Sequence, residues 1–351
     1  MLVVDDSSAM RQLLKLALTD LPDVEVVGTA SSGDLALRRI EFLRPDLITL
    51  DIEMPGLGGL ETLSQIREDH PTIRVLIVSS LTKRGALVTL DALSRGASDY
   101  VSKPQVSSPE EGVLALRKEL VPRIRSLCGP SEDLPRHVVE QARRTPTATW
   151  RIRSRRPEVI VVASSTGGPP ALGKFLSGLP ESFPCPILVV QHMPKVFTGP
   201  FAERLNSQMP LHVREAVAGA KPLAGQVWIA PGDSHLLLER GGDGLRLALS
   251  DAPQVNFCRP AADLLFESSA DACPGQVLGV VLTGMGCDGS AGAARIREDG
   301  GRVLVQDEAT SVVWGMPGNV ARAGHASEIL PLERLAARLV ELAPRTCSLD
   351  T

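Results

Sequence analysis

The stretch EVIVVASSTGGPP, residues 158–170, decides how the second half of this chain folds. Five apolar or β-branched residues, Val159 to Ala163, predict a buried strand, and the polar and glycine residues after them predict a sharp turn into a helix from about Pro169. A serine in such a turn projects beyond the edge of the sheet. It also lies next to the first N–H groups of the helix, which suit an oxygen that becomes negative during acyl transfer.

The same turn has two other interpretations. It is equally typical of a loop that cradles a phosphate or of a plain glycine-rich connection, and the segment alone does not separate these from a nucleophile. The nucleophile-elbow pattern G-x-S-x-G is not matched, because Ala163 stands at the first glycine position. A catalytic role for the turn therefore depends on partner residues elsewhere in the chain.

Length and composition indicate a globular protein of two domains. The 351 residues exceed one ordinary core, and 43% apolar with 22% charged residues are typical of such proteins. A net charge of −4 argues against nucleic acid as a partner. No apolar run is long enough to span a membrane and the chain opens directly into VVDD, so we expect a cytoplasmic protein without membrane insertion. The six cysteines form no C-x-x-C pair, which argues against zinc or disulfides.

The first domain alternates short apolar strands with amphipathic helices up to about residue 104, which predicts a five-stranded parallel sheet. The expected strands are residues 1–4, 24–27, 47–50, 75–78 and 98–101, and a helix is expected over 110–127. Polar side chains follow these strands at the carboxyl edge of the sheet, where such folds bind ligands: Asp5, Asp6, Asp51, Ser79 and Lys103. Three clustered carboxylates suit Mg²⁺, and a lysine opposite them can hold a phosphoryl oxygen.

This half of the chain resembles a response-regulator receiver domain of the flavodoxin-like class. The resemblance rests on VVDDS at 3–7, LDIEMPGLGG at 50–59, VSS at 78–80 and SKP at 102–104. It implies that Asp51 accepts the phosphoryl group, that Asp5 and Asp6 bind Mg²⁺ together with Asp51, that Ser79 and Lys103 contact the phosphoryl group, and that Tyr100 is the aromatic switch residue. Each residue alone could be a helix cap or a solvated charge, but their joint placement favours the functional interpretation.

Residues 128–156 are expected to form a linker between a receiver domain at 1–127 and a second domain at 157–351. This stretch mixes proline, arginine and both charge signs without a sustained apolar period, with one helical turn expected around His137. The basic run from Arg151 to Arg156 is interpreted as a solvated approach to the next strand, because no aromatic stacking pattern accompanies it.

The second domain resumes the alternation of strands and helices. Beyond the strand at 159–163, strands are expected at 187–191, 226–230, 277–282 and 302–306, and a hairpin at 235–239 and 245–249 turns through the glycine-rich residues 241–244. The pattern predicts a doubly wound, mostly parallel α/β domain with an inserted β-hairpin.

Three strand ends in this domain carry the chemistry. His192 follows the strand at 187–191 and Asp288 lies in a glycine-rich loop after the strand at 277–282, so a parallel sheet can bring both to the serine turn. A hydroxyl, a base and a carboxylate are what nucleophilic catalysis needs. The other histidines lack a comparable signature, although His235 could line the site. Cys287 is an alternative nucleophile, but we expect it to be a small residue packed in its loop.

The order Ser, His, Asp differs from that of the common hydrolase triads, and here the chain resembles the chemotaxis protein-glutamate methylesterase (CheB) family. The motifs are ASSTGG (163–168), QHMP (191–194), APGDSH (230–235), LTGMGCDG (282–289) and QDEATSVVWGMP (306–317). The resemblance implies a Ser165–His192–Asp288 triad, with Ser165 rather than Ser164 as the nucleophile, since it precedes Thr-Gly-Gly. Backbone N–H groups near Thr166 and Met285 are candidates for the oxyanion hole.

The resemblance also implies substrates, partners and regulation. The enzyme would remove methyl groups from glutamate γ-methyl esters of chemotaxis receptors and deamidate receptor glutamines, with no cofactor for the esterase, and would act as a monomer. A chemotaxis histidine kinase would phosphorylate the receiver, which in the unphosphorylated form would cover the active-site entrance. Two alternatives are a non-catalytic scaffold with a relic triad and a regulator with a DNA-binding output. The intact triad disfavours the first, and the lack of helix-turn-helix spacing disfavours the second.

Overall fold

The structure is a computed structural model that describes residues 1–105, 108–129 and 156–343. The chain divides into two compact units, Met1–Pro130 and Ser131–Thr351, which are described one at a time. The helical turn expected around His137 lies outside the described residues. Among the residues that the structure describes, we find no helix whose length and apolar character would let it cross a membrane.

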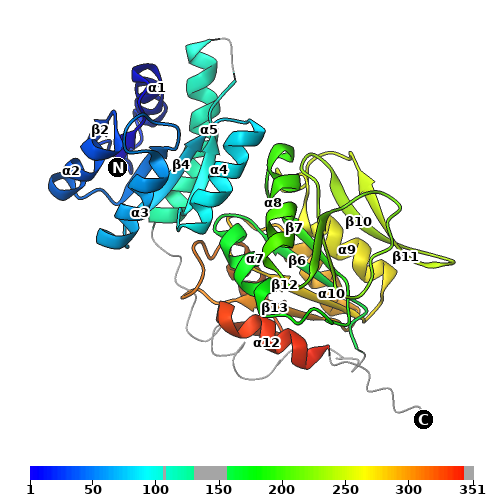
Figure 1. Ribbon diagram of the computed structural model, residues 1–351. Helices are drawn as coiled ribbons and strands as arrows, with labels where there is room; N and C mark the ends of the chain where they lie inside the picture. The colour runs from blue at the N-terminus through cyan, green and yellow to red at the C-terminus, as the bar shows by residue number, and fades with distance from the viewer. Residues whose placement is uncertain (106–107, 130–155, 344–351) are drawn as a thin grey trace. The chain divides into compact units, whose positions relative to one another are not determined.

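The first unit is built around a five-stranded sheet of order β2-β1-β3-β4-β5, in which every neighbouring pair is parallel. This confirms the predicted flavodoxin-like class. The strands are β1 (Leu2–Val4), β2 (Gly28–Ala30), β3 (Leu47–Asp51), β4 (Arg74–Ser79) and β5 (Asp99–Ser102). The helices are α1 (Ser8–Leu18), α2 (Gly33–Leu43), α3 (Gly59–Asp69), α4 (Lys83–Ser94) and α5 (Pro109–Cys128), labelled in Figure 1.

The strand predicted at residues 24–27 was wrong. The observed strand β2 begins at Gly28, where it pairs with Leu2 of β1. The N–H of Val27 still donates to the carbonyl of Met1 at 2.9 Å, but residues 24–26 lie before the first residue of β1 in this register. A β-branched run therefore stays outside the sheet, because strand pairing and not local propensity decides which residues join a ladder.

The second unit contains a seven-stranded sheet of order β14-β13-β12-β6-β7-β9-β8, again parallel at every pairing. Its strands are β6 (Val159–Ser164), β7 (Ile187–Gln191), β8 (His212–Glu215), β9 (Gln226–Ile229), β12 (Val277–Val281), β13 (Arg302–Gln306) and β14 (Glu328–Leu330). Its helices are α7 (Gly168–Ser177), α8 (Lys195–Gln208), α9 (Ala262–Ala272), α10 (Ser290–Glu298), α11 (Met316–Arg322) and α12 (Leu332–Leu342). The predicted hairpin is confirmed as an antiparallel pair, β10 (His235–Gly241) and β11 (Gly244–Ser250).

The sequence did not predict the two edge strands, β8 and β14. Each has only three or four residues, and most of those residues are partly exposed or exposed. Edge strands bury one side of the backbone only, so they lack the continuous apolar run that marks a central parallel strand.

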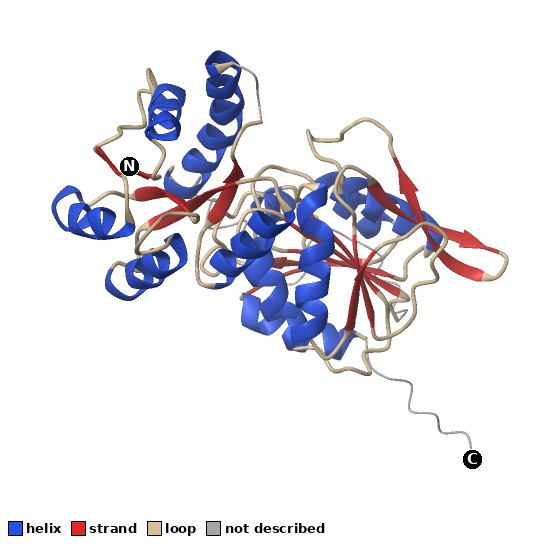
Figure 2. Ribbon diagram, turned by 45° about the horizontal axis from the view of Figure 1, so that its top comes forward, coloured by secondary structure: helices blue, strands red, loops and turns tan. Residues whose placement is uncertain are grey.

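Helices cover both faces of the large sheet, as Figure 2 shows. Val159, Val161 and Ala163 of β6 belong to a buried cluster that also contains Phe266 of α9 and Ile296 of α10. Because side chains alternate along a strand, the intervening residues of β6 face the opposite side. Both faces of β6 are thus buried, which is why its residues 159–163 are all apolar.

Strand order reverses at β6, which lies between β12 and β7. In open α/β sheets, the crevice beyond the carboxyl ends of the strands at such a switch point is the usual place for a ligand. The three strands that precede Ser165, His192 and Asp288 are the central strand and its two neighbours. The fold therefore brings the ends of these strands to one crevice.

Candidate functional site

The two adjacent serines after β6 have different surroundings. The Ser164 side chain is fully buried, and its hydroxyl donates to Gln191 Oε1 at 2.7 Å. Ser165 is partly exposed, beyond the last residue of the strand. Gly167 follows in the left-handed conformation, with φ of 73°, and α7 then begins at Gly168. The turn therefore presents Ser165, while Ser164 is held in the core.

Hydrogen bonds tie the Ser165 turn to the end of β7. The His192 N–H donates to the Ser164 carbonyl at 3.0 Å. The Gln191 side-chain amide donates to the carbonyls of Ser165, at 3.0 Å, and of His192, at 3.2 Å. Gln191 thus fixes the serine turn and the histidine relative to each other, although its role was not predicted from the sequence.

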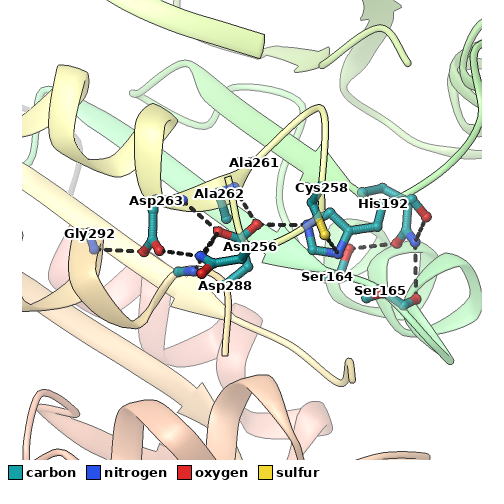
Figure 3. A network of polar contacts seen from close by, with 12 residues as sticks. Ser164, Ser165, His192, Asn256, Cys258, Ala261, Ala262, Asp263, Asp288 and Gly292 are labelled. Carbon is teal, nitrogen blue, oxygen red and sulfur yellow. Dashed lines mark hydrogen bonds and ion pairs between the residues drawn. The ribbon is translucent and has the colours of Figure 1, made fainter. Parts of the chain in front are cut away.

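His192 and Asp288 form a close ion pair. His192 Nε2 lies 2.7 Å from Asp288 Oδ2, and the Asp288 side chain is almost fully buried. The other ring nitrogen, Nδ1, lies 3.7 Å from Cys258 Sγ. Figure 3 shows the imidazole between the Asp288 carboxylate and the turn that carries Ser164 and Ser165. The pairing leaves Nδ1 as the nitrogen that can exchange a proton with a substrate or nucleophile.

Backbone N–H groups hold the Asp288 carboxylate in place. Oδ2 accepts from Ala262 at 2.6 Å, and Oδ1 accepts from Asp263 at 3.1 Å and from Gly289 at 3.0 Å. Ala262 and Asp263 begin α9, whose first N–H groups and dipole favour an anion. Burial raises the pKa of Asp288, but these donors and His192 outweigh it and hold that pKa below its usual range.

The same ion pair shifts the pKa of His192 in the opposite direction. Burial lowers the pKa of His192, yet its hydrogen bond with Asp288, together with the Cys258 contact, raises the pKa above its ordinary value. The two pKa shifts are opposite in sign and share one cause, because each partner favours the charged form of the other. A histidine in this setting is a stronger base than one in water.

Two further residues of this network were missed by the sequence reasoning. The Asn256 amide donates to Asp263 Oδ2 at 2.8 Å and to Asp288 Oδ1 at 3.3 Å. Asp263 Oδ1 in turn accepts from the Gly292 N–H at 2.8 Å. The signal available in the sequence was the asparagine and the aspartate of NFCRPAAD, residues 256–263, which lead from the hairpin into the next helix.

The loop after β12 approaches the serine closely. A Cβ added to Gly284 would lie 2.9 Å from Ser165 Cβ and 2.4 Å from Met316 Sδ, so only glycine fits there. Met285 follows directly and is partly exposed. The Thr166 carbonyl accepts from the Thr283 hydroxyl at 2.9 Å, which joins the two loops. Both expected oxyanion donors therefore lie on backbone segments adjacent to Ser165.

The structure differs from the sequence-based expectations for His235 and Cys287. His235 is buried, with Nδ1 accepting from the Ala261 N–H and Nε2 contacting the Pro253 carbonyl, each at 3.1 Å. It supports the segment that leads to α9 and does not line an open site. The expectation that Cys287 is packed in its loop was wrong, because Cys287 is exposed. Gly286, the residue before it, has a φ of 89° and is exposed as well.

The carboxylates of the first unit meet at the carboxyl edge of its sheet. Ligand oxygens of Asp5, Asp6 and Asp51 lie within 4.8 Å of one another. Lys103 Nζ lies 2.7 Å from Asp51 Oδ2 and 3.1 Å from Asp5 Oδ2. Burial raises the pKa of Asp5, and the Asp51 charge raises it further. Oxygen donors that repel one another in this way fit a divalent cation such as Mg²⁺.

The remaining receiver residues lie in different surroundings. The Ser79 hydroxyl accepts from the Thr89 hydroxyl at 2.7 Å and faces the Gly85 carbonyl at 3.4 Å, so it is held against α4. Tyr100 is buried in β5, and burial raises its pKa. The Ser79 hydroxyl must change partners if it is to contact a phosphoryl group.

Comparison with known proteins agrees with both units. Residues 160–339 match the CheB methylesterase family, and residues 1–116 match the response regulator receiver domain family. The chain is 46% identical over 345 residues to a protein-glutamate methylesterase/protein-glutamine glutaminase of Trichodesmium erythraeum, covering 97% of each chain. It is 47% identical over 351 residues to the protein of the same name from Nocardioides sp., covering 98% of this chain and 95% of that one.

A solved structure resembles the second unit. The crystal structure of the Thermotoga maritima CheB methylesterase catalytic domain is 40% identical, with a TM-score of 0.52, and the match covers 54% of this chain and 100% of that one. Receiver domains as a family are phosphorylated with the help of Mg²⁺, which the carboxylate cluster fits. The chain therefore belongs to the CheB methylesterase family and carries a response regulator receiver domain ahead of its methylesterase domain.

Proposed function

We propose that this methylesterase hydrolyses glutamate γ-methyl esters on chemotaxis receptors, and deamidates receptor glutamines, through an acyl-enzyme on Ser165. The observation that carries the proposal is the His192–Asp288 pair, 2.7 Å apart, at the ends of the two strands that flank the serine strand. The names of the relatives support the reaction, since they describe methylesterases that are also glutaminases.

In the first step, Ser165 Oγ attacks the ester carbonyl carbon while its proton moves to His192 Nδ1. Asp288 accepts the hydrogen bond from Nε2–H, so it selects the tautomer with the lone pair on Nδ1 and stabilises the imidazolium that forms. The two ring nitrogens have exchanged roles relative to chymotrypsin, in which the aspartate binds Nδ1 and Nε2 is the base.

The tetrahedral oxyanion would be stabilised by the backbone N–H groups of Thr166 and Met285. Collapse of this intermediate expels methanol, which takes the proton from His192, and leaves an ester between Ser165 and the glutamyl group. A water molecule then repeats the sequence, with His192 as its base, and releases the glutamate carboxylate. With a glutamine substrate the leaving group is ammonia, and every other step is the same.

The receiver would control this chemistry through Asp51. A chemotaxis histidine kinase is the proposed phosphodonor, and the enzyme is proposed to act as a monomer in the cytoplasm. Asp5, Asp6 and Asp51 would hold Mg²⁺, which supplies positive charge beside the phosphoryl oxygens. Lys103, already 2.7 Å from Asp51, would bind a phosphoryl oxygen. A phosphoryl group adds up to about two negative charges, enough to draw the Ser79 hydroxyl from its α4 partners.

The direct test uses membranes that carry receptors labelled on the methyl group. The purified chain should release labelled methanol, and the loss of label from glutamate should match the methanol that appears. Binding to the receptors without any release of methanol would support the scaffold alternative and contradict the proposed function.

Phosphorylation should raise the rate only through Asp51. A small phosphodonor with Mg²⁺ is expected to increase methanol release by the wild-type chain and to leave the Asp51→Ala variant at its unphosphorylated rate, because the acceptor carboxylate is gone. Glu53→Ala, two residues further along in the loop that follows β3, is the control and should still respond. Equal activation of Asp51→Ala and wild type would exclude Asp51 as the acceptor.

A further inference from the structure

The segment between the hairpin and α9 contains a tight turn at Asn256 and Phe257. Val255 and Cys258 pair through two backbone hydrogen bonds, of 3.1 and 2.9 Å, so only two residues close the turn. Asn256 has φ of 51° and Phe257 has φ of 61°. Positive φ at both central positions is the requirement of a type I′ turn, which usually carries Asn-Gly. Phe257 therefore occupies the position at which glycine is favoured.

The residues on either side of Phe257 contact the catalytic pair. The Asn256 amide lies 3.3 Å from Asp288 Oδ1, and Cys258 Sγ lies 3.7 Å from His192 Nδ1. Figure 3 shows Asn256 and Cys258 at these two contacts. Asn256 and Cys258 thus hold the turn against the active site, while the ring of Phe257 between them is exposed.

The Phe257 ring has almost no contact with the rest of the chain. It is 96% exposed, more than any other large apolar side chain that the structure describes. Burial therefore does not offset the strain of a left-handed phenylalanine, which the turn would avoid with glycine or asparagine. Strained residues cluster at active sites and ligand clamps. Because the Phe257 ring is exposed, a contact that uses it is made with another molecule.

We propose that Phe257 is a docking contact for the receptor, and that its ring packs on an apolar patch of the receptor surface beside the modified glutamate. This inference rests on the proposed function, because it takes a protein-bound glutamate as the substrate. A protein-bound glutamate that reaches Ser165 brings its neighbouring residues past the turn at residues 255–258, which contacts both His192 and Asp288. An apolar neighbour of the glutamate then comes within reach of the exposed ring.

The test replaces Phe257 by asparagine, which tolerates the left-handed conformation. Two substrates are compared with the full chain and phosphodonor present: methylated receptors in membranes, and a short peptide with one glutamate γ-methyl ester. We expect the ratio of kcat/KM for receptor to kcat/KM for peptide to fall at least about tenfold. This is the loss of affinity expected when an important interface residue is truncated. The thermal midpoint of the methylesterase domain should rise by roughly 2 °C, because the strain is relieved.

Two control variants separate docking from other effects. Phe257→Tyr keeps the ring and should keep the ratio near that of the wild type. Phe42→Asn removes an 88% exposed phenylalanine from α2 of the first unit and should leave the ratio unchanged.

Three results would overturn the inference. The first is a receptor-to-peptide ratio of kcat/KM in Phe257→Asn within about twofold of wild type. The second is an equal loss of kcat/KM on both substrates, which would mean that the turn supports His192. The third is a rise in the unphosphorylated rate on both substrates, which would make Phe257 part of the restraint imposed by the receiver. A wild-type chain inactive on both substrates would instead contradict the proposed function itself.

Discussion

Replacing Ser165 by alanine should abolish methanol release from methylated receptors. The variant lacks the oxygen that attacks the ester, and removal of the serine from another triad costs about 10⁶ in kcat. Because the Ser165 side chain is partly exposed at the end of β6, the change should leave the fold intact. Single-turnover assays with labelled receptors measure the loss, and circular dichroism checks the fold.

Ser164→Ala is the matched control, one residue away. It removes the hydroxyl that donates to Gln191 Oε1 and leaves that buried oxygen without its donor, so we expect a loss of about 1–3 kcal/mol in unfolding free energy. Most of the activity should remain, since Gln191 still binds the Ser165 and His192 carbonyls through its amide nitrogen. The opposite pattern, an inactive Ser164→Ala and an active Ser165→Ala, would make Ser164 the nucleophile.

Asp288→Asn should lower kcat by about 10⁴, the effect of the same change in a serine protease triad. Both carboxylate oxygens already accept backbone N–H groups, and Oδ2 also contacts His192. An amide NH₂ at either position would face donors, so the variant either loses its backbone contacts or turns a donor toward His192. In both cases the charge that stabilises the imidazolium is gone.

The pH dependence of the same variant tests the electrostatic part of the argument. His192 must be neutral to act as a base, so kcat/KM rises with pH through the pKa of His192 in the free enzyme. Asp288 raises that pKa, and its removal should therefore move the midpoint of the rise to lower pH. A near-normal rate in the folded variant, with an unmoved midpoint, would show that another group orients the histidine.

Asp263→Asn is the control for loss of a nearby buried charge. Asp263 accepts from Gly292 and Asn256 but does not contact His192. The variant should lose less than about tenfold in kcat/KM, because the carboxylate that pairs with the histidine is retained. A loss as large as that of Asp288→Asn would mean that the network as a whole, and not the one ion pair, supports the base.

Local patterns in the sequence were enough to predict the fold class and the central strands. Strands β7 and β13 occupy the predicted residues, since strands buried on both faces are marked by apolar residues in succession. The same reasoning placed His192 and Asp288 just beyond strand ends, and a parallel sheet brings such ends to one edge. The same reasoning did not predict the edge strands β8 and β14, because partly exposed strands lack a continuous apolar run.

Only the tertiary structure decided how the site is held together. The sequence could not indicate that Asp288 binds the first N–H groups of α9, since those groups belong to a helix 25 residues earlier in the chain. It could not choose which ring nitrogen of His192 meets the carboxylate, or bring Cys258 and Asn256 to the pair. Periodicity reports which face of an element is buried, whereas hydrogen bonds between distant loops depend on the orientation of each side chain after packing. The sequence therefore determined which residues reach the edge of the sheet, and the folded structure determined which of their atoms meet.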